Sequence, residues 1–408
     1  MAVNLARVFV SIFLISALAA AVKASEQDAL LISDVIEQRH MPHGVIVAPV
    51  FASASSDRVV AYSRGADAAI WTGHYLAAES FRYKVTGELE ALENARAALR
   101  GISSLRRVTG TNLLARCLFP TDWTFASSIR HEEAGHGIYT RNLDGRAYNW
   151  VGNTSRDQYM GVFFGLAIAF DLIDEPDVRQ IIREEVTALL EFLLDRDWAI
   201  VMPDLRISTV FWARTDQQLA LLQIGRHVNP VRFNAAYDEH RARYSSSVAV
   251  PVSFEILDTH GSYFKFNINA IGFYNLVRLE DSSKHRKRYL KAYKILRKAT
   301  RKHGNAHFNM IDRALKGADV ARDGETLRLL DQWLMRPRRD VRVDLRDRYR
   351  ACSSGRACAP VPVEERVTTD FLWQRSPFQL SGGGSGTIET PGIDYILPYW
   401  MARYYELL

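Results

Sequence analysis

Residues 65–87, GADAAIWTGHYLAAESFRYKVTG, carry side chains that could do acid–base and binding chemistry at helical spacing. Asp67, Trp71 and His74 share one face of the expected helix, because residues three and four apart lie above one another. A carboxylate and an imidazole can transfer protons, and an indole can stack on a ring. This pattern predicts one wall of a binding cleft; an ordinary buried polar network is the alternative. Three further binding candidates lie beside the face: Tyr75, Glu79 and Arg82.

Residues 148–174, YNWVGNTSRDQYMGVFFGLAIAFDLID, join a polar cluster to a strongly apolar helix. The motif SRDQ fits an N-terminal capping box, and Asp157 in the first turn would be favoured by the helix dipole. The following helix is apolar on all sides, with glycines at 161 and 165 that would let another backbone approach closely. We expect Asp157 to do chemistry as well as to cap. Capping leaves several neighbouring side chains unexplained, and we predict that they bind a ligand: Trp150, Asn153 and Arg156.

Polar and aromatic residues recur at the starts of other expected helices and in a loop near the C-terminus. The glycine-rich stretch 381–386 lacks the Lys-Ser/Thr of a phosphate-binding loop, so we interpret it as a flexible bend. The binding candidates from these segments are Trp212, Asn267, Trp373 and Arg375. Arg214 and Lys265 are further polar residues at the starts of expected inner helices.

These segments belong to helices that come in pairs joined by short turns. The first helix of a pair tends to be rich in aromatic and small residues, which is typical of an inner helix. The second tends to be amphipathic and charged, which is typical of an outer helix. We therefore predict an all-α fold, an (α/α)6-type toroid with long loops over one mouth; an open α-solenoid is the alternative. The expected pairs are 67–86 with 89–107, 156–174 with 177–196, 214–227 with 230–243, 265–280 with 284–302, 305–317 with 322–335, and 28–39 with 393–407.

The alternation of hairpins, the aromatic-lined inner helices and the motif WTGHYLA at 71–77 together resemble the six-hairpin (α/α) glycosidases. That class includes unsaturated glucuronyl and rhamnogalacturonyl hydrolases, and its shape recurs in sugar epimerases and polysaccharide lyases. The resemblance covers most of the chain as a pattern, and no complete catalytic motif matches residue by residue. It implies a central cleft that binds carbohydrate, with acids on the inner helices.

We therefore expect a carbohydrate-active enzyme, a glycoside hydrolase that acts on an oligosaccharide. Glycoside cleavage commonly uses two carboxyl groups, and Asp67 and Asp157 are the pair that we predict. A sugar epimerase or lyase would instead use His74 or a tyrosine as its base. A non-catalytic glycan-binding or envelope protein on the same fold would keep the aromatic residues and need no acid pair.

The first residues resemble a secretory signal peptide. Arg7 precedes the apolar run 8–22, and small residues at a V-x-A site end at Ala24. We expect cleavage after residue 24, a secreted or periplasmic protein, one domain over 25–408, and no stable membrane insertion after cleavage; an uncleaved N-terminal anchor is the alternative.

The net charge is +6, and the basic run 284–302 dominates it locally. We interpret this run as the solvated face of an outer helix, packed inward through Tyr289, Tyr293 and Leu296; attraction to a polyanion is the alternative, with nucleic acid disfavoured by export.

The chain has three cysteines. Cys352 and Cys358 are close enough in sequence for a local disulfide in an exported protein, and Cys117 is then a buried thiol. Their spacing does not match a zinc site, and we predict no metal and no cofactor.

Overall fold

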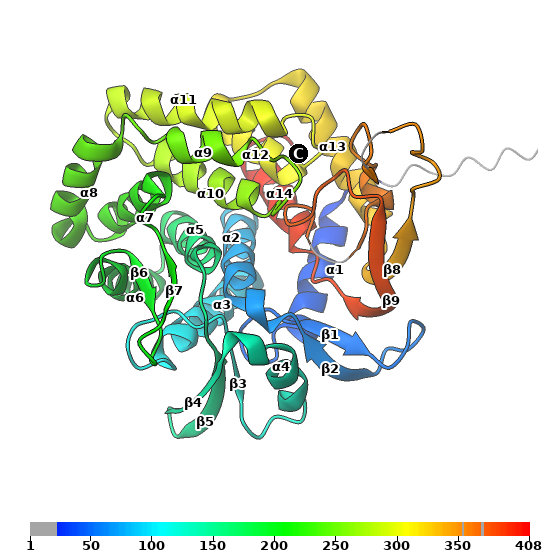
Figure 1. Cartoon of the computed structure of the whole chain (residues 1–408), viewed down its shortest axis with the longest axis horizontal. Coiled ribbons are helices and arrows are strands. Elements are labelled where there is room, and N and C mark those ends of the chain that lie inside the picture. Colours follow the sequence, from blue (N-terminus) through cyan, green and yellow to red (C-terminus); the bar gives the residue numbers. More distant parts are fainter. Residues whose placement is uncertain (1–22, 353–354, 369–370) are drawn as a thin grey trace, which may run out of the picture.

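The computed structural model describes residues 23–352, 355–368 and 371–408, and this part of the chain is mostly helical (Figure 1). Helices form in all the predicted pairs, with ends that differ by a few residues. Residues 1–22 of the predicted signal peptide lie outside the described residues. The helices of the pairs are α1 (Glu26–Val35), α2 (Ala68–Thr86), α3 (Leu89–Arg107), α5 (Arg156–Leu172), α6 (Pro176–Leu194), α7 (Thr215–Val228), α8 (Pro230–Tyr244), α10 (Lys265–Arg278), α11 (Ser283–Thr300), α12 (Ala306–Lys316), α13 (Val320–Leu334) and α14 (Ile393–Tyr404).

One helix of each pair, the first of five pairs and the second (α14) of the pair with α1, contacts its neighbours in a closed order. α2 packs against α5, α5 against α7, α7 against α10, α10 against α12, α12 against α14, and α14 returns to α2. Each second helix packs on its own partner, and α1 packs on α14. α2 and α5 are buried along most of their lengths, whereas α3 and α11 keep an exposed face. Figure 1 shows α2 and α5 near the centre and α8 and α11 farther out.

Glycines bring α2 and α5 into backbone contact. A Cβ atom on Gly73 would lie 2.1 Å from the carbonyl oxygen of Gly161, and one on Gly165 would lie 2.2 Å from that of Gly73. No larger residue fits at such distances. The close approach expected from the glycine pair is confirmed, and it sets the N-terminal ends of the two helices side by side.

The all-α prediction is wrong in part, because the long connecting segments hold short strands. Whether a segment forms a strand depends on contacts with neighbouring strands that can lie far away in sequence. A search for helical periodicity does not detect such strands. Two short helices, α4 (Ala126–Glu132) and α9 (Val250–Glu255), also lie in these connections. The strands are β1 (Ala48–Phe51), β2 (Val59–Ser63), β3 (Cys117–Pro120), β4 (Ile138–Leu143), β5 (Arg146–Val151), β6 (Ala199–Val201), β7 (Ile207–Val210), β8 (Arg339–Asp344) and β9 (Ser381–Glu389).

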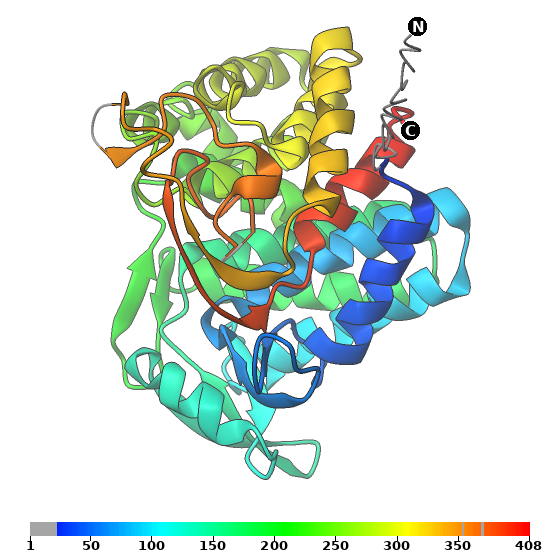
Figure 2. The ribbon, with the colours of Figure 1, turned by 90° about the vertical axis from the view of Figure 1, so that its right-hand side faces the viewer.

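The strands form three small antiparallel sheets, in the orders β2-β1-β9-β8, β3-β5-β4 and β6-β7. β9 contains the glycine-rich stretch, so the interpretation of that stretch as a flexible bend is wrong. A Cβ atom on Gly383 would lie 2.0 Å from the carbonyl oxygen of Val341 on β8, so glycine allows this close strand pairing. Figure 2 shows β8 and β9 (orange to red) beside α14 and α1.

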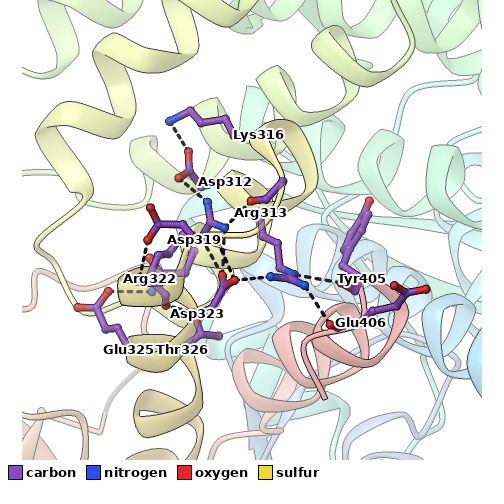
Figure 3. A network of polar contacts seen from close by, with 12 residues as sticks. Asp312, Arg313, Lys316, Asp319, Arg322, Asp323, Glu325, Thr326, Tyr405 and Glu406 are labelled. Atoms are coloured by element: carbon purple, nitrogen blue, oxygen red, sulfur yellow. Dashed lines mark hydrogen bonds and ion pairs between the residues drawn. The ribbon is translucent and has the colours of Figure 1, made fainter.

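An ionic network joins the α12–α13 turn to the residues that follow α14 (Figure 3). Asp323 accepts hydrogen bonds from Arg313 and Arg322. Arg313 also donates through Nε to the carbonyl oxygen of Tyr405 at 3.0 Å. Asp312 pairs with Arg322 at 3.0 Å and with Lys316 at 2.6 Å. The network fixes the last hairpin against the C-terminal helix.

Cys352 and Cys358 form a disulfide, and Cys117 is a buried free thiol. Among residues 23–352, 355–368 and 371–408, no helix has the length and apolar character needed to cross a membrane.

Candidate active-site cavity

A cavity of about 610 Å³ opens where the N-terminal ends of α2, α5, α7 and α10 meet. Asp67 is the N-cap of α2, and Asp157 is the second residue of α5. Arg214 directly precedes α7, and Lys265 begins α10. The cavity therefore collects the first turns of four helices that are far apart in sequence. The other lining residues are Ala66, Arg116, His136, Ser155, Arg156, Thr209, Gln217, Glu255, Ser262, Phe264, Ile268, Gln374 and Arg375.

Asp67 is held in the cavity wall by nitrogen donors from three other segments. Gln158 donates from Nε2 to Oδ1 at 3.3 Å, and Gln374 donates from Nε2 to Oδ2 at 3.2 Å. Arg116 Nη1 lies 3.9 Å from Oδ1. The backbone N–H of Ile70 donates to Gln158 Oε1 at 3.0 Å, which fixes the amide so that its NH2 group faces Asp67.

Asp157 has a different kind of partner, a hydroxyl group. Ser155 Oγ donates to Asp157 Oδ1 and accepts from Arg116 Nη2 at 2.8 Å. Ser155 is the N-cap residue, yet its side chain does not bind a backbone N–H of α5, so the predicted capping box is wrong. The serine instead binds Asp157, and Gln158 reaches across to α2. Arg116 therefore connects the surroundings of Asp67 and Asp157.

The lining contains five cationic side chains and three carboxylates. Arg214 is neutralised by Asp216 at 2.7 Å and by Glu255. Arg156 donates to the carbonyl oxygen of Val210 at 2.8 Å and forms no ion pair with a carboxylate of the described residues. Burial and the neighbouring Arg214 guanidinium lower the pKa of Arg156. Lys265 lies 4.0 Å from Asp258, and Arg116 lies 3.9 Å from Asp67. Arg156 is the lining cation that could bind an anionic group of a ligand.

Four predicted binding residues lie in the core beneath the cavity and not in its wall. His74 stacks on Trp373 with ring centroids 5.1 Å apart, and its Nε2 lies 3.0 Å from Asn267 Nδ2. Trp71 packs edge-on against Phe371 at 4.9 Å. Burial lowers the pKa of His74 to about 4, so the ring is neutral at pH 7. The segment around residue 373 fills the space between the inner helices and covers these side chains.

Tyr75, Glu79 and Arg82 form a buried polar network, which was the alternative interpretation of the first helix. Tyr75 donates to Glu37 at 2.8 Å. Glu79 accepts from Arg82 at 3.3 Å and from Ser33 at 2.7 Å. Burial raises the pKa of Glu79 to about 7. These residues join α1, α2 and α3, and none of them lines the cavity.

Three other candidates also lie outside the lining. Trp150 is buried on β5 and stacks on Tyr139 at 4.4 Å. Asn153 is exposed, and its carbonyl oxygen accepts from Arg116 at 2.9 Å. Trp212 is 56 % exposed, with Nε1 donating to the carbonyl oxygen of Asp197 at 2.6 Å. Of the predicted site, the structure gathers Asp67, Asp157, Arg156 and Arg375 around one cavity.

Arg116, Glu255 and Gln374 were not predicted. Arg116 and Gln374 lie in connecting segments without helical periodicity, and Glu255 is the last residue of the short helix α9. The place of each depends on contacts with residues far away in sequence. Arg116 reaches Ala66 O at 2.7 Å across 50 residues. No local signal in the sequence marks such a residue.

Within the described ranges, no group of three or more His, Cys, Asp or Glu side chains is arranged to hold a metal ion. A comparison of the chain with protein-family models and with curated proteins found no match.

Proposed function

We propose that this protein is a glycoside hydrolase that acts on an oligosaccharide, with Asp67 and Asp157 as its two carboxyl groups. The observation that carries the proposal is that both carboxylates line one open cavity of about 610 Å³, a size that suits a small saccharide. Glycoside cleavage commonly needs two carboxyl groups on opposite sides of the scissile bond.

The partners of the two carboxylates suggest separate roles. Three partners of Asp67 are amide and guanidinium nitrogens, which can only donate and therefore bind the ionised form. The partner of Asp157 is a hydroxyl, which can also accept a hydrogen bond from a protonated carboxyl group. We assign Asp157 as the proton donor and Asp67 as the base or nucleophile.

The guanidinium group of Arg156, which forms no ion pair with a carboxylate of the described residues, supports an acidic saccharide as substrate. The closed order of the helix contacts supports an (α/α)6-type toroid with the cavity at one mouth of the ring. The proposal retains export to the periplasm or the exterior, which rests on residues 1–24.

The test is release of reducing ends from a panel of acidic and neutral oligosaccharides. Asp67→Asn and Asp157→Asn should each lower kcat by at least about a hundredfold, since asparagine hydrogen-bonds but does not transfer protons. Asp195→Asn, at an exposed residue, is the matched control. Binding of an acidic oligosaccharide with no turnover of any panel member would favour the non-catalytic glycan-binding alternative.

A further inference from the structure

The exposed side of α11 is a continuous row of positive charge. The helix is about 27 Å long at about 1.5 Å per residue, and no Asp or Glu lies between residues 282 and 302. Nine cationic side chains on it and just after it are exposed, and none forms an ion pair within the described part of the chain. They are Lys284, Arg286, Lys287, Arg288, Lys291, Lys294, Lys298, Arg301 and Lys302.

These charges do not serve the fold. Lys287, Lys291, Lys294 and Lys298 follow one another at spacings of three and four, where like charges destabilise a helix. The helix is held by its opposite side, where the stripe of tyrosines and leucine expected from the sequence is buried. A row of cations that repel one another and have no acidic partner in the described part of the chain indicates an external anion.

A stripe of apolar side chains lies on the neighbouring helix α9 and on the turn that follows it, and α9 packs against α11. Val250, Phe254 and Leu257 follow at spacings of four and three, and their exposed fractions are 52 %, 70 % and 80 %. Val252, in the same helix, is fully buried and supplies the contact with the core. The exposed stripe is therefore additional to what the packing of α9 requires.

We propose that α9 and α11 together form a docking face for an anionic membrane surface. The cations of α11 would lie against acidic lipid headgroups, and the stripe of α9 would enter the boundary between headgroups and acyl chains. A soluble polyanion such as an acidic polysaccharide would engage the cations but would leave the apolar stripe in water, so the two features together favour a lipid surface. This docking is peripheral, and it does not depend on the proposed hydrolase activity.

The test is co-sedimentation of the chain that begins at Ser25, where we expect the mature protein to start, with lipid vesicles. We expect binding to vesicles that contain phosphatidylglycerol, none to pure phosphatidylcholine, and weaker binding at about 0.5 M salt because the charges are screened. The variant K287E/K291E/K294E/K298E should bind at least about a hundredfold more weakly, since each basic residue near such a surface contributes several-fold to the affinity. The neutral variant K287Q/K291Q/K294Q/K298Q should lie between the two.

The matched control is R58E/K84E/R130E/R328E, which makes the same change of charge at four exposed cations on other elements. It should keep most of the binding, and circular dichroism should show that all variants are folded. The variant F254S/L257S should bind phosphatidylglycerol vesicles at least about tenfold more weakly while its binding to dextran sulfate is unchanged. The proposal is wrong if the wild-type chain does not bind these vesicles, if the two charge-reversed variants bind them equally, or if F254S/L257S binds them as the wild type does.

Discussion

Gln158 on α5 donates a hydrogen bond from Nε2 to Asp67 at the start of α2, over 3.3 Å. The Oε1 atom of Gln158 accepts a hydrogen bond from the backbone N–H of Ile70 on α2. This second bond fixes the orientation of the amide, so Nε2 stays directed at Asp67. The proposed base is thereby oriented by a residue of a different helix.

This bond predicts the behaviour of Gln158→Glu. The new carboxyl group would face Asp67 at hydrogen-bond distance, where two like charges cannot both be accommodated, so one proton must be shared. We expect kcat at pH 7 to fall by at least about tenfold and to recover partly at lower pH, where the protonated side chain can donate as the amide does. A pH profile of kcat/KM that is parallel to the wild-type profile would contradict this role. Gln180→Glu on the exposed side of α6 is the control.

The buried His74 predicts a loss of stability in mild acid. Burial lowers its pKa from 6.5 to about 4, so between these values the unfolded chain binds a proton that the folded chain does not. The free energy of unfolding therefore falls as the pH drops from about 6.5 to about 4, and at pH 5 the contribution of one such group is about 2 kcal/mol. In His74→Gln, the decrease in unfolding free energy between pH 7 and pH 5 should be smaller by about that amount, measured by urea denaturation. An equal decrease in both proteins would mean that this histidine is protonated in the fold.

Trp71 should behave as a core residue. Its side chain is fully buried against Phe371, so Trp71→Ala should lower the free energy of unfolding by about 3–5 kcal/mol. Trp212→Ala removes an exposed indole and should cost far less. Chemical denaturation of both variants checks the difference, and a stable Trp71→Ala protein with weakened ligand binding would restore the cleft-wall interpretation.

We expect the negative charge of Asp323, in the network of Figure 3, to stabilise the fold. This carboxylate neutralises Arg313 and Arg322, all three being largely buried. Asp323→Asn leaves two guanidinium groups with less compensation, and we expect the free energy of unfolding to fall by about 3–5 kcal/mol. Asp344→Asn, which removes one partner of an exposed pair with Arg346, should change it little. Equal thermal stability of the two variants would show that the network contributes no more than a surface pair.

The helices could be predicted because their signal is local. Apolar residues that recur every three or four positions determine which face of a helix is buried, and prolines and short polar turns mark where one helix ends. The strands could not be predicted in this way. Gly383, for example, is required by the close approach of β8, whose sequence lies about forty residues earlier.

Apart from Arg375, which lies in a loop, the site could be predicted only at the first turns of inner helices. Asp67 and Asp157 lie at helix starts and face the cavity. Trp71 and His74 share the helical face of Asp67, but they lie about 6 Å and about 10 Å farther along α2 at about 1.5 Å per residue. At that depth the segment with Trp373 covers this face of α2. The same face therefore lines the cavity at the N-terminal end of α2 and is part of the core farther along the helix. Helical periodicity gives the direction of a side chain around the axis and contains no information about this depth.

The contact between Gly73 and Gly161 leaves no layer of side chains between α2 and α5. Most helix pairs are separated by interlocking side chains, which can repack when a neighbour is substituted and so let one helix slide by a fraction of an ångström. Here the spacing is fixed by main-chain atoms, so only a substitution of the contacting glycines themselves would change it. Substitutions elsewhere in the core therefore do not change the relative position of the two helix ends. The relative position of Asp67 and Asp157 is preserved with it.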